Sequence, residues 1–343
     1  MSHRVLEIIT PQDKAAQVES ALAEFSFLFV WCLSRTEETV VWRALTDAET
    51  VEPVLDRLEN RFGHVSGFRV ILQSVEAVVP APAEPEKEPG DAPAPKVARI
   101  SRPELYEDIA GESALTWRFV VMVLLAAIVV TVGLVRDSSV IVLAAMVIAP
   151  LLGPNMALAL GTTLGDTGMI RRSARAAGIG FALAFVLAVV YGFVASPPLE
   201  SAEIVARTGF GGGDLVLALA AGVAGTLAYT TGASSSLIGV MVAVALLPPT
   251  VVAGFMVGRG AWSQATAAVL LLVSNVLCVH LAAVGTFVAQ GVKPSKWWEA
   301  EKAKRASRHS LIISIGLVLG LIGLLIVRGV VLDGQGWAGE VLP

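Results

Sequence analysis

SSVIVLAAMVIAPLLGP (Ser138–Pro154) and SSLIGVMVAVALLPP (Ser235–Pro249) are two stretches of the same design in one chain. Each opens with paired serines, continues as an apolar run and ends at a Gly-Pro or a Pro-Pro pair. Both lie in apolar segments long enough to cross a lipid bilayer, where a proline interrupts a helix at an energetic cost. The chain makes this interruption twice, and the position of each stretch among the membrane spans decides how the two are related.

The composition of the chain is that of a membrane protein. Of its 343 residues, 55% are hydrophobic and only 16% are charged, whereas soluble domains carry about 25% charged residues. The net charge of −4 does not indicate a nucleic-acid surface. Cys32 and Cys278 lie in segments of different character, so neither a disulfide nor a metal site is expected, and no cofactor is predicted. No secretory leader pattern opens the sequence, so we expect the N-terminus to stay in the cytoplasm.

A linker divides the chain. The run PAPAEPEKEPGDAPAPK (Pro80–Lys96) is rich in proline, alanine and acidic residues, and such a run cannot bury a core. The segment after it places Leu105 and Ile109 among acidic residues, which predicts either a short amphipathic helix at the membrane interface or an ordinary solvated connector. The predicted parts are a cytoplasmic domain at 1–79, a linker at 80–100, an interfacial segment at 101–114, a transmembrane domain at 115–331 and a short external tail at 332–343.

The N-terminal domain alternates strand-like and helical patterns. RVLEIIT (Arg4–Thr10) is strand-like, and Val18, Leu22 and Phe25 then recur at helical spacing. Two β-rich runs joined by a polar turn follow as a hairpin, and a second helical pattern precedes a last strand that begins near Phe68. The order β-α-β-β-α-β is the ferredoxin-like plan, an α+β fold that occurs in ligand-binding regulatory domains and in inert ones. The sequence therefore predicts this fold and no particular ligand.

Seven apolar segments after the linker are each long enough to span about 30 Å of hydrocarbon as a helix. Lysines and arginines gather between the second and third segments and between the sixth and seventh, which puts both loops on the side of the N-terminal domain if all seven segments cross. Because positively charged loops face the cytoplasm, we expect a cytoplasmic N-terminus and an external C-terminus. The predicted spans of this α-helical polytopic protein are 115–135, 138–162, 174–195, 214–230, 235–257, 263–290 and 311–331.

The order of the spans gives the two opening stretches a geometric relation. One lies in the second span and the other in the fifth, so three-span units built around them have opposite orientations in the membrane. Paired interruptions at matching places of two inverted halves indicate the central site of a transporter, here a 3+3 inverted repeat. The alternative is that the similarity is incidental and that the prolines bend helices for packing alone. The candidate substrate-binding residues are Ser138, Ser139, Pro150, Gly153, Pro154, Asn155, Ser234, Ser235, Ser236, Pro248, Pro249 and Asn275.

Three ordered motifs resemble a known family. GLVRDSSVIVLAAMVIAPLLGP (Gly133–Pro154), GVAGTLAYTTGASSSLIGVMVAVALLPP (Gly222–Pro249) and the asparagine of SNVL at Asn275 are similar to the hydrophobic proteins grouped as domain of unknown function 389. The resemblance covers about Ser101–Gly291 and implies a prokaryotic multi-pass protein of the plasma membrane with a soluble N-terminal extension. It implies no substrate. One departure is the Ala-Ala-Met at 144–146, where the family usually has Gly-Ala-Met, and this weakens the expectation of a tight helix approach there.

Three classes of function compete for this sequence. A transporter or channel explains the doubled interruptions, and serines at helix starts favour a small polar or anionic solute. A sensor or scaffold explains a small domain on a tether, with a bundle that anchors and oligomerises. The small-residue motif GLVLG (Gly316–Gly320) suits a helix contact, and we expect a homo-oligomer in the lipid bilayer with no nucleic-acid partner. An enzyme needs convergent acids, histidines or an activated nucleophile, and the spans hold almost none, so no enzymatic activity is expected.

Overall fold

The computed structural model describes most of the chain. The chain divides into two compact units, Met1–Tyr106 and Glu107–Pro343. The last predicted span and the serines at 234–236 of the candidate site fall outside the described residues, apart from single positions in that span. The described residues are 3–79, 100–195, 201–209, 212–232 and 246–293, with Ile312, Ile315, Gly316, Leu319 and Gly323 beyond them.

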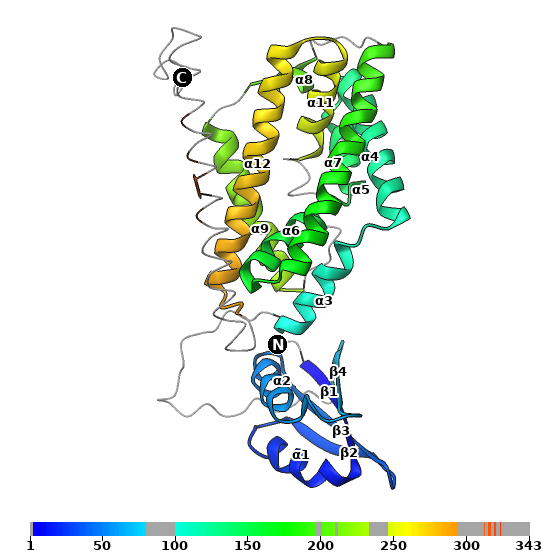
Figure 1. Ribbon diagram of the computed structural model, residues 1–343, viewed down its shortest axis with the longest axis vertical. Coiled ribbons are helices and arrows are strands. Elements are labelled where there is room, and N and C mark those ends of the chain that lie inside the picture. Colours follow the sequence, from blue (N-terminus) through cyan, green and yellow to red (C-terminus); the bar gives the residue numbers. More distant parts are fainter. Residues whose placement is uncertain are drawn as a thin grey trace. The chain divides into compact units, whose positions relative to one another are not determined.

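The first unit is a four-stranded antiparallel sheet with two helices (Figure 1). The strand order is β2-β3-β1-β4, so the first strand lies inside the sheet and pairs with both β3 and β4. Strands and α-helices follow one another as β-α-β-β-α-β, the order that the sequence predicts. The elements are β1 (His3–Pro11), a 3₁₀ turn (Gln12–Lys14), α1 (Ala15–Leu22), β2 (Phe29–Arg35), β3 (Thr39–Asp47), α2 (Ala48–Phe62) and β4 (Arg69–Ser74).

Alternation along the strands decides which face of this sheet is buried. Every second residue of β1 is buried, and Leu6 and Ile8 are fully so, because successive side chains of a strand point to opposite faces. Val18 of α1 and Leu58 of α2 pack into the same core, at the positions that helical spacing predicts. Full burial of one such side chain is worth about 1.5–3 kcal/mol. The first unit therefore has a hydrophobic core of its own.

Helix α3 (Arg102–Glu112) begins in this unit. Its first residue, Arg102, donates to Asp56 at 2.7 Å, and Glu104 forms a 3.0 Å ion pair with the buried Arg4. The predicted segment 101–114 is thus helical as far as Glu112. Its two apolar residues, Leu105 and Ile109, are fully buried, which argues against an ordinary solvated connector. Its position at a membrane interface stays a prediction.

The second unit is helical. Among the residues described, four helices are long and apolar enough to cross a membrane, or five if the bent pair α5–α6 counts as one span. The seven predicted spans are not all accounted for, since the fifth is described only from Leu246 and the seventh only at single positions. The helices are α4 (Trp117–Val135), α5 (Ser139–Ile148), α6 (Leu152–Leu164), α7 (Thr167–Ala195), α8 (Ala202–Val205), α9 (Gly212–Thr230), α11 (Leu247–Gly258) and α12 (Trp262–Ala289).

Helix α7 begins earlier than predicted. The sequence placed Arg171, Arg172 and Arg175 between the second and third spans, although Arg175 already falls within the span at 174–195. Helix α7 starts at Thr167 and contains all three. A carboxylate oxygen of Asp166 accepts from the backbone N–H of Met169 at 3.0 Å and so caps this earlier start. The three arginines are exposed on the first turns of the helix, next to its apolar part.

The first opening stretch is broken between α5 and α6. The two helices are bent by 54°, and Ala149 between them is extended (ψ 117°), as a residue before proline prefers. Pro154 is the third residue of α6, where a backbone N–H has no acceptor within the helix. Pro154 therefore removes no helical hydrogen bond, and the expectation that it interrupts a helix is wrong. Pro150 follows the end of one helix, and Pro154 lies in the first turn of the next.

The second opening stretch has the same relation to its helix. Pro248 and Pro249 are the second and third residues of α11, so they too lie in a first turn and cost no helical hydrogen bond. The part of this stretch before Leu246 lies outside the described residues. Leu247 and Val251 of α11 belong to the same buried cluster as Ala149 and Leu151 at the first break. Both helix starts thus pack on one core.

Glycines set the direction of α11. A Cβ at Gly254 would lie 2.6 Å from the carbonyl oxygen of Phe185, and one at Gly258 would lie 2.8 Å from the backbone nitrogen of Phe193. The backbones of α11 and α7 are therefore in contact, and the two helices run in the same direction. Gly260 turns the chain in the left-handed region (φ 70°), and α12 then packs back along α11. Helices α7 and α12 thus run in opposite directions (Figure 1).

Candidate functional site

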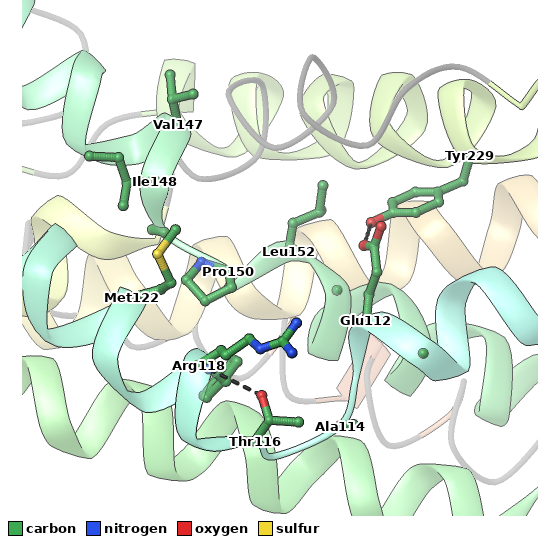
Figure 2. A pocket seen from close by; sticks show the side chains of 14 residues that line it. Glu112, Ala114, Thr116, Arg118, Met122, Val147, Ile148, Pro150, Leu152 and Tyr229 are labelled. Atoms are coloured by element: carbon green, nitrogen blue, oxygen red, sulfur yellow. Dashed lines mark hydrogen bonds between the residues drawn. The ribbon is translucent and has the colours of Figure 1, made fainter.

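A cavity of about 340 Å³ lies at the break between α5 and α6 (Figure 2). Three parts of the second unit that are distant in sequence meet around it: the end of α3 with the start of α4, the break itself, and the end of α9. Most of the wall is apolar, and its charged groups come from two side chains, Glu112 and Arg118. The lining residues are Gly111, Glu112, Ala114, Thr116, Arg118, Phe119, Met122, Val147, Ile148, Ala149, Pro150, Leu152, Gly153 and Tyr229.

Glu112 joins the three parts of the wall. The hydroxyl group of Tyr229 donates a hydrogen bond to a carboxylate oxygen of Glu112, and a hydrogen bond to a charged group contributes about 1.5–3 kcal/mol. Gly153 lies against the same residue, because a Cβ there would be 2.8 Å from the Cβ of Glu112 and 2.9 Å from its carbonyl oxygen. Only a glycine lets the end of α3 approach the first turn of α6 this closely. The carboxylate is thereby held between α9 and α6.

Arg118 supplies the positive charge of the cavity. It is the second residue of α4, a helix capped by Thr116, whose hydroxyl oxygen accepts from the backbone N–H of Phe119 at 3.2 Å. Figure 2 shows the guanidinium group of Arg118 pointing into the space that these residues enclose. Within the described part of the chain, no carboxylate pairs with this guanidinium group. The cavity wall therefore holds an exposed cation with no carboxylate partner among the described residues, and a carboxylate that accepts a hydrogen bond from Tyr229.

The break adds backbone donors to the cavity wall. Leu152 and Gly153 are the first two residues of α6 and line the cavity. The first N–H groups of a helix have no acceptor within it. In a membrane such groups need protein, water or a solute as partner, since lipid chains offer none. The break therefore offers backbone donors from the start of α6 to a polar or anionic group.

The structure brings only part of the predicted site to this cavity. Pro150 and Gly153 line it, whereas Pro154 and Asn155 lie in the first turns of α6 outside the lining. The Asn155 side chain is buried and donates to the carbonyl oxygen of Leu151 at 2.7 Å. Of the remaining predicted residues that are described, Pro248 and Pro249 are buried at the start of α11, Asn275 is buried on α12, and Ser138 and Ser139 lie at the far end of α5, about 15 Å of helix from the break.

Sequence reasoning missed Glu112, Arg118 and Tyr229. Each is a single polar residue at the edge of an apolar segment, and nothing in its immediate neighbourhood separates it from an ordinary interfacial residue. Tyr229 does lie inside the second family motif, which was the one signal available. The three come together only because α3, α4 and α9 end or begin at the same place, which is a property of packing.

The start of α11 repeats the start of α6. Leu151 and Leu246 precede the two helices, and each carbonyl group accepts from the side chain of the residue four positions later. The donors are Asn155 and Thr250, at 2.7 Å in both cases. Thr250 is buried, as Asn155 is. The two opening stretches therefore share a local structure as well as a sequence pattern.

Comparison with known proteins shows a family similarity for the region that holds these features. Residues 146–281 match the family model described as a domain of unknown function (DUF389). The predicted family resemblance is confirmed. The matched region contains the break, both helix starts, Tyr229 and Asn275, while Glu112 and Arg118 precede it.

A curated relative extends the similarity beyond the DUF389 region. The chain is 29% identical to the uncharacterized protein MJ0678 of Methanocaldococcus jannaschii over 298 residues, which are 87% of this chain and 91% of the relative. No solved structure matches the chain. The similarity thus reaches well outside the helix starts, to most of both chains.

Proposed function

We propose that this protein is a multi-pass transporter or channel that moves a small polar or anionic solute across a prokaryotic plasma membrane. The observation that carries the proposal is the cavity at the α5–α6 break, where Arg118 faces an interrupted apolar helix. Non-helical backbone at membrane depth is tolerated where it is buried in protein or lines a wet cavity. Here it lines a cavity, and interrupted helices of this kind hold the substrate in many transporters.

The hydrogen bonding of the cavity favours an anionic group beside Arg118. Glu112 already accepts from Tyr229, whereas Arg118 has no carboxylate partner among the described residues. Two opposite unit charges 4 Å apart attract each other by about 4 kcal/mol at an effective dielectric constant of 20. An anion beside Arg118 thus gains more from the site than a neutral solute of the same size, and a cation is repelled.

The membrane topology is part of the same proposal. Seven spans with a cytoplasmic N-terminal domain and an external C-terminus account for the basic residues, because Arg171, Arg172 and Arg175 lie exposed at the start of α7. The 3+3 inverted repeat is also part of this proposal. Its support is that the two opening stretches start α6 and α11 in the same way and that α7 and α12 run in opposite directions. We also expect no enzymatic activity, and a homo-oligomer.

The N-terminal domain is proposed to be a ferredoxin-like regulatory module. Its element order and the pairing of β1 with both β3 and β4 support that fold. One observation favours the second candidate function, a membrane-anchored sensor or scaffold. All residues of the edge strand β2 are exposed, Phe29 and Trp31 among them, and an exposed apolar edge strand invites pairing with another chain. A protein that assembles through β2 needs no solute path.

Solute flux into proteoliposomes tests the proposal. The full chain is reconstituted, and the uptake of a panel of small anions, neutral osmolytes and monovalent cations is compared. Arg118→Gln removes the cavity charge and is expected to lower anion uptake about ten-fold, which corresponds to about 1.4 kcal/mol of lost interaction. Arg136→Gln is the matched control, since Arg136 is exposed at the other end of α4 and outside the lining. Its uptake should equal that of the unmodified protein.

Two results would count against the proposal. If no member of the panel enters faster than into protein-free liposomes, the protein is not a carrier of such solutes, and the sensor or scaffold becomes the better candidate. If uptake occurs and both arginine variants behave alike, the cavity is not on the solute path.

A further inference from the structure

The helices of the second unit form two series, and each helix of the second series begins 95 residues after its counterpart in the first. Helices α4 and α9 begin at 117 and 212 and end at 135 and 230, so both ends differ by 95 residues. The starts of α6 and α11, 152 and 247, differ by 95 as well, and so do those of α7 and α12, 167 and 262. The chain between these helix starts is therefore equally long in both series. Unrelated helices have no reason to keep one spacing through three pairs of elements.

The same spacing relates turns and side-chain hydrogen bonds. Gly165 and Gly260 precede α7 and α12, and both adopt the left-handed region, with φ of 71° and 70°. Three pairs of polar side chains 95 residues apart also make matching bonds, each to a carbonyl group three or four residues earlier. They are Thr131 and Thr226 (2.7 and 2.8 Å), Asn155 and Thr250 (2.7 Å each), and Ser113 and Thr208 (2.9 Å each).

Burial follows the spacing too. The helices of the two series bury the same faces, although their residues are mostly different. This extends to α3 and the short helix α8, where the two buried isoleucines correspond. Buried pairs 95 residues apart are Ile109 and Ile204, Val123 and Ala218, Ala126 and Ala221, Ala184 and Val279, and Ala188 and Ala283.

We infer that 107–195 and 202–290 are two copies of one structural unit, and that the protein changes state when the two copies exchange conformations. The copies have opposite orientations, since α7 and α12 run in opposite directions. Two such copies are related by a pseudo-two-fold axis in the membrane plane, and exchange of their conformations moves the access route from one side of the membrane to the other. This inference rests on the proposed transport function and adds the mechanism by which the solute crosses.

The two copies differ in the described state. Leu152 at the start of α6 lines the cavity, whereas its counterpart Leu247 at the start of α11 is fully buried in the core. The first copy therefore faces the cavity in the described state, whereas Leu247 of the second copy has no exposed surface. In the exchanged state we expect Leu247 to line a cavity that opens to the opposite side.

Cysteine labelling in oriented membrane vesicles tests the exchange. In a background with Cys32→Ser and Cys278→Ala, Met122→Cys reports on the described cavity and Leu247→Cys on its counterpart. A membrane-impermeant maleimide should label Met122→Cys from the side on which α4 begins and Leu247→Cys from the opposite side. The described state is then locked by a disulfide between Glu112→Cys and Gly153→Cys, whose Cβ positions would lie 2.8 Å apart, so the two segments must separate by about 1 Å to reach disulfide distance. Locking should abolish labelling at Leu247→Cys, leave labelling at Met122→Cys, and be reversed by a reductant.

The outcomes separate this inference from the proposed function. Three results at Leu247→Cys would overturn the exchange, even if liposomes take up solute. They are no labelling from either side, labelling from the same side as Met122→Cys, and equal labelling before and after locking. If Leu247→Cys is labelled from the opposite side and the lock abolishes this labelling, the exchange is supported. This holds even if no tested solute moves, in which case only the proposed transport of these solutes fails. Thermal unfolding of each variant, compared with the cysteine-free parent, confirms that the labelled proteins are folded.

Discussion

The starts of α6 and α11 have the same local structure and different surroundings. Each begins after a leucine whose carbonyl oxygen accepts a side-chain hydrogen bond, and each carries a proline as its third residue. The first faces a cavity because Gly153 admits the end of α3 there. The second is buried, and its helix lies against the backbone of α7. The local motif thus decides where a helix begins, and the neighbouring segments decide whether that place is open.

The packed helix should be the more sensitive one to added volume. Gly254→Ala places a methyl group 2.6 Å from the carbonyl oxygen of Phe185 and from the Cβ of Ala188, and backbone atoms cannot move aside as a flexible side chain can. We expect a loss of about 3 kcal/mol of unfolding free energy, the upper end of the usual cost of overpacking. Denaturation in mixed detergent micelles, followed by tryptophan fluorescence, measures it.

Gly178→Ala is the control for that variant. It lies on α7 with no neighbouring atom within 4 Å of an added Cβ, and alanine in a helix is more stable than glycine by about 0.5–1 kcal/mol. The control should therefore be slightly more stable than the parent. Equal stabilities for the two variants would show that α11 and α7 are not in contact in the membrane protein.

The helix starts were predictable from the sequence, and the cavity was not. Prolines and the extended residue before them act on the nearest turn, so the interruption near Pro150 and the strand–helix order of the first unit follow from local patterns. The burial of alternate residues in β1 follows in the same way. Glu112, Arg118 and Tyr229 instead lie far apart in the sequence or at segment edges, and only the packing of three helices brings them together. The role of Pro154 was misjudged because its place depended on where α6 begins.

The open helix start should depend on the hydrogen bond that holds its wall. Tyr229→Phe removes the donor to Glu112 and leaves the carboxylate without this partner, so a loss of about 2 kcal/mol is expected for a bond to a charged group. Tyr191→Phe is the matched control, because that ring contacts Phe255 and makes no hydroxyl hydrogen bond within the described residues. The same denaturation assay compares the two. A loss of stability in Tyr191→Phe as large as in Tyr229→Phe would remove the special role of the Glu112 contact.

The shared hydrogen bond should contribute equally at both helix starts. Asn155→Ala and Thr250→Ala each delete a 2.7 Å bond to the leucine carbonyl oxygen before the helix, and a neutral hydrogen bond is worth about 1 kcal/mol. The expected losses are therefore similar, with some addition from the cavity that truncation leaves. Thr286→Ala, which deletes a bond of the same kind far from either helix start, shows what the bond costs elsewhere. Losses at 155 and 250 that differ by more than about 1 kcal/mol would mean that the two starts are not equivalent.

The smallest effects are expected at the prolines themselves. Pro154→Ala and Pro249→Ala add a backbone N–H in the first turn of α6 or α11, where no acceptor lies within the helix. No helical hydrogen bond is gained, and the unfolded chain becomes more flexible, so each variant should lose about 0.4–1 kcal/mol. A proline inside a helix would behave in the opposite way, because its replacement recovers about 3 kcal/mol. A gain of stability in either variant would show that the helix continues through the proline in the membrane, and it would remove the break on which the comparison of the two starts depends.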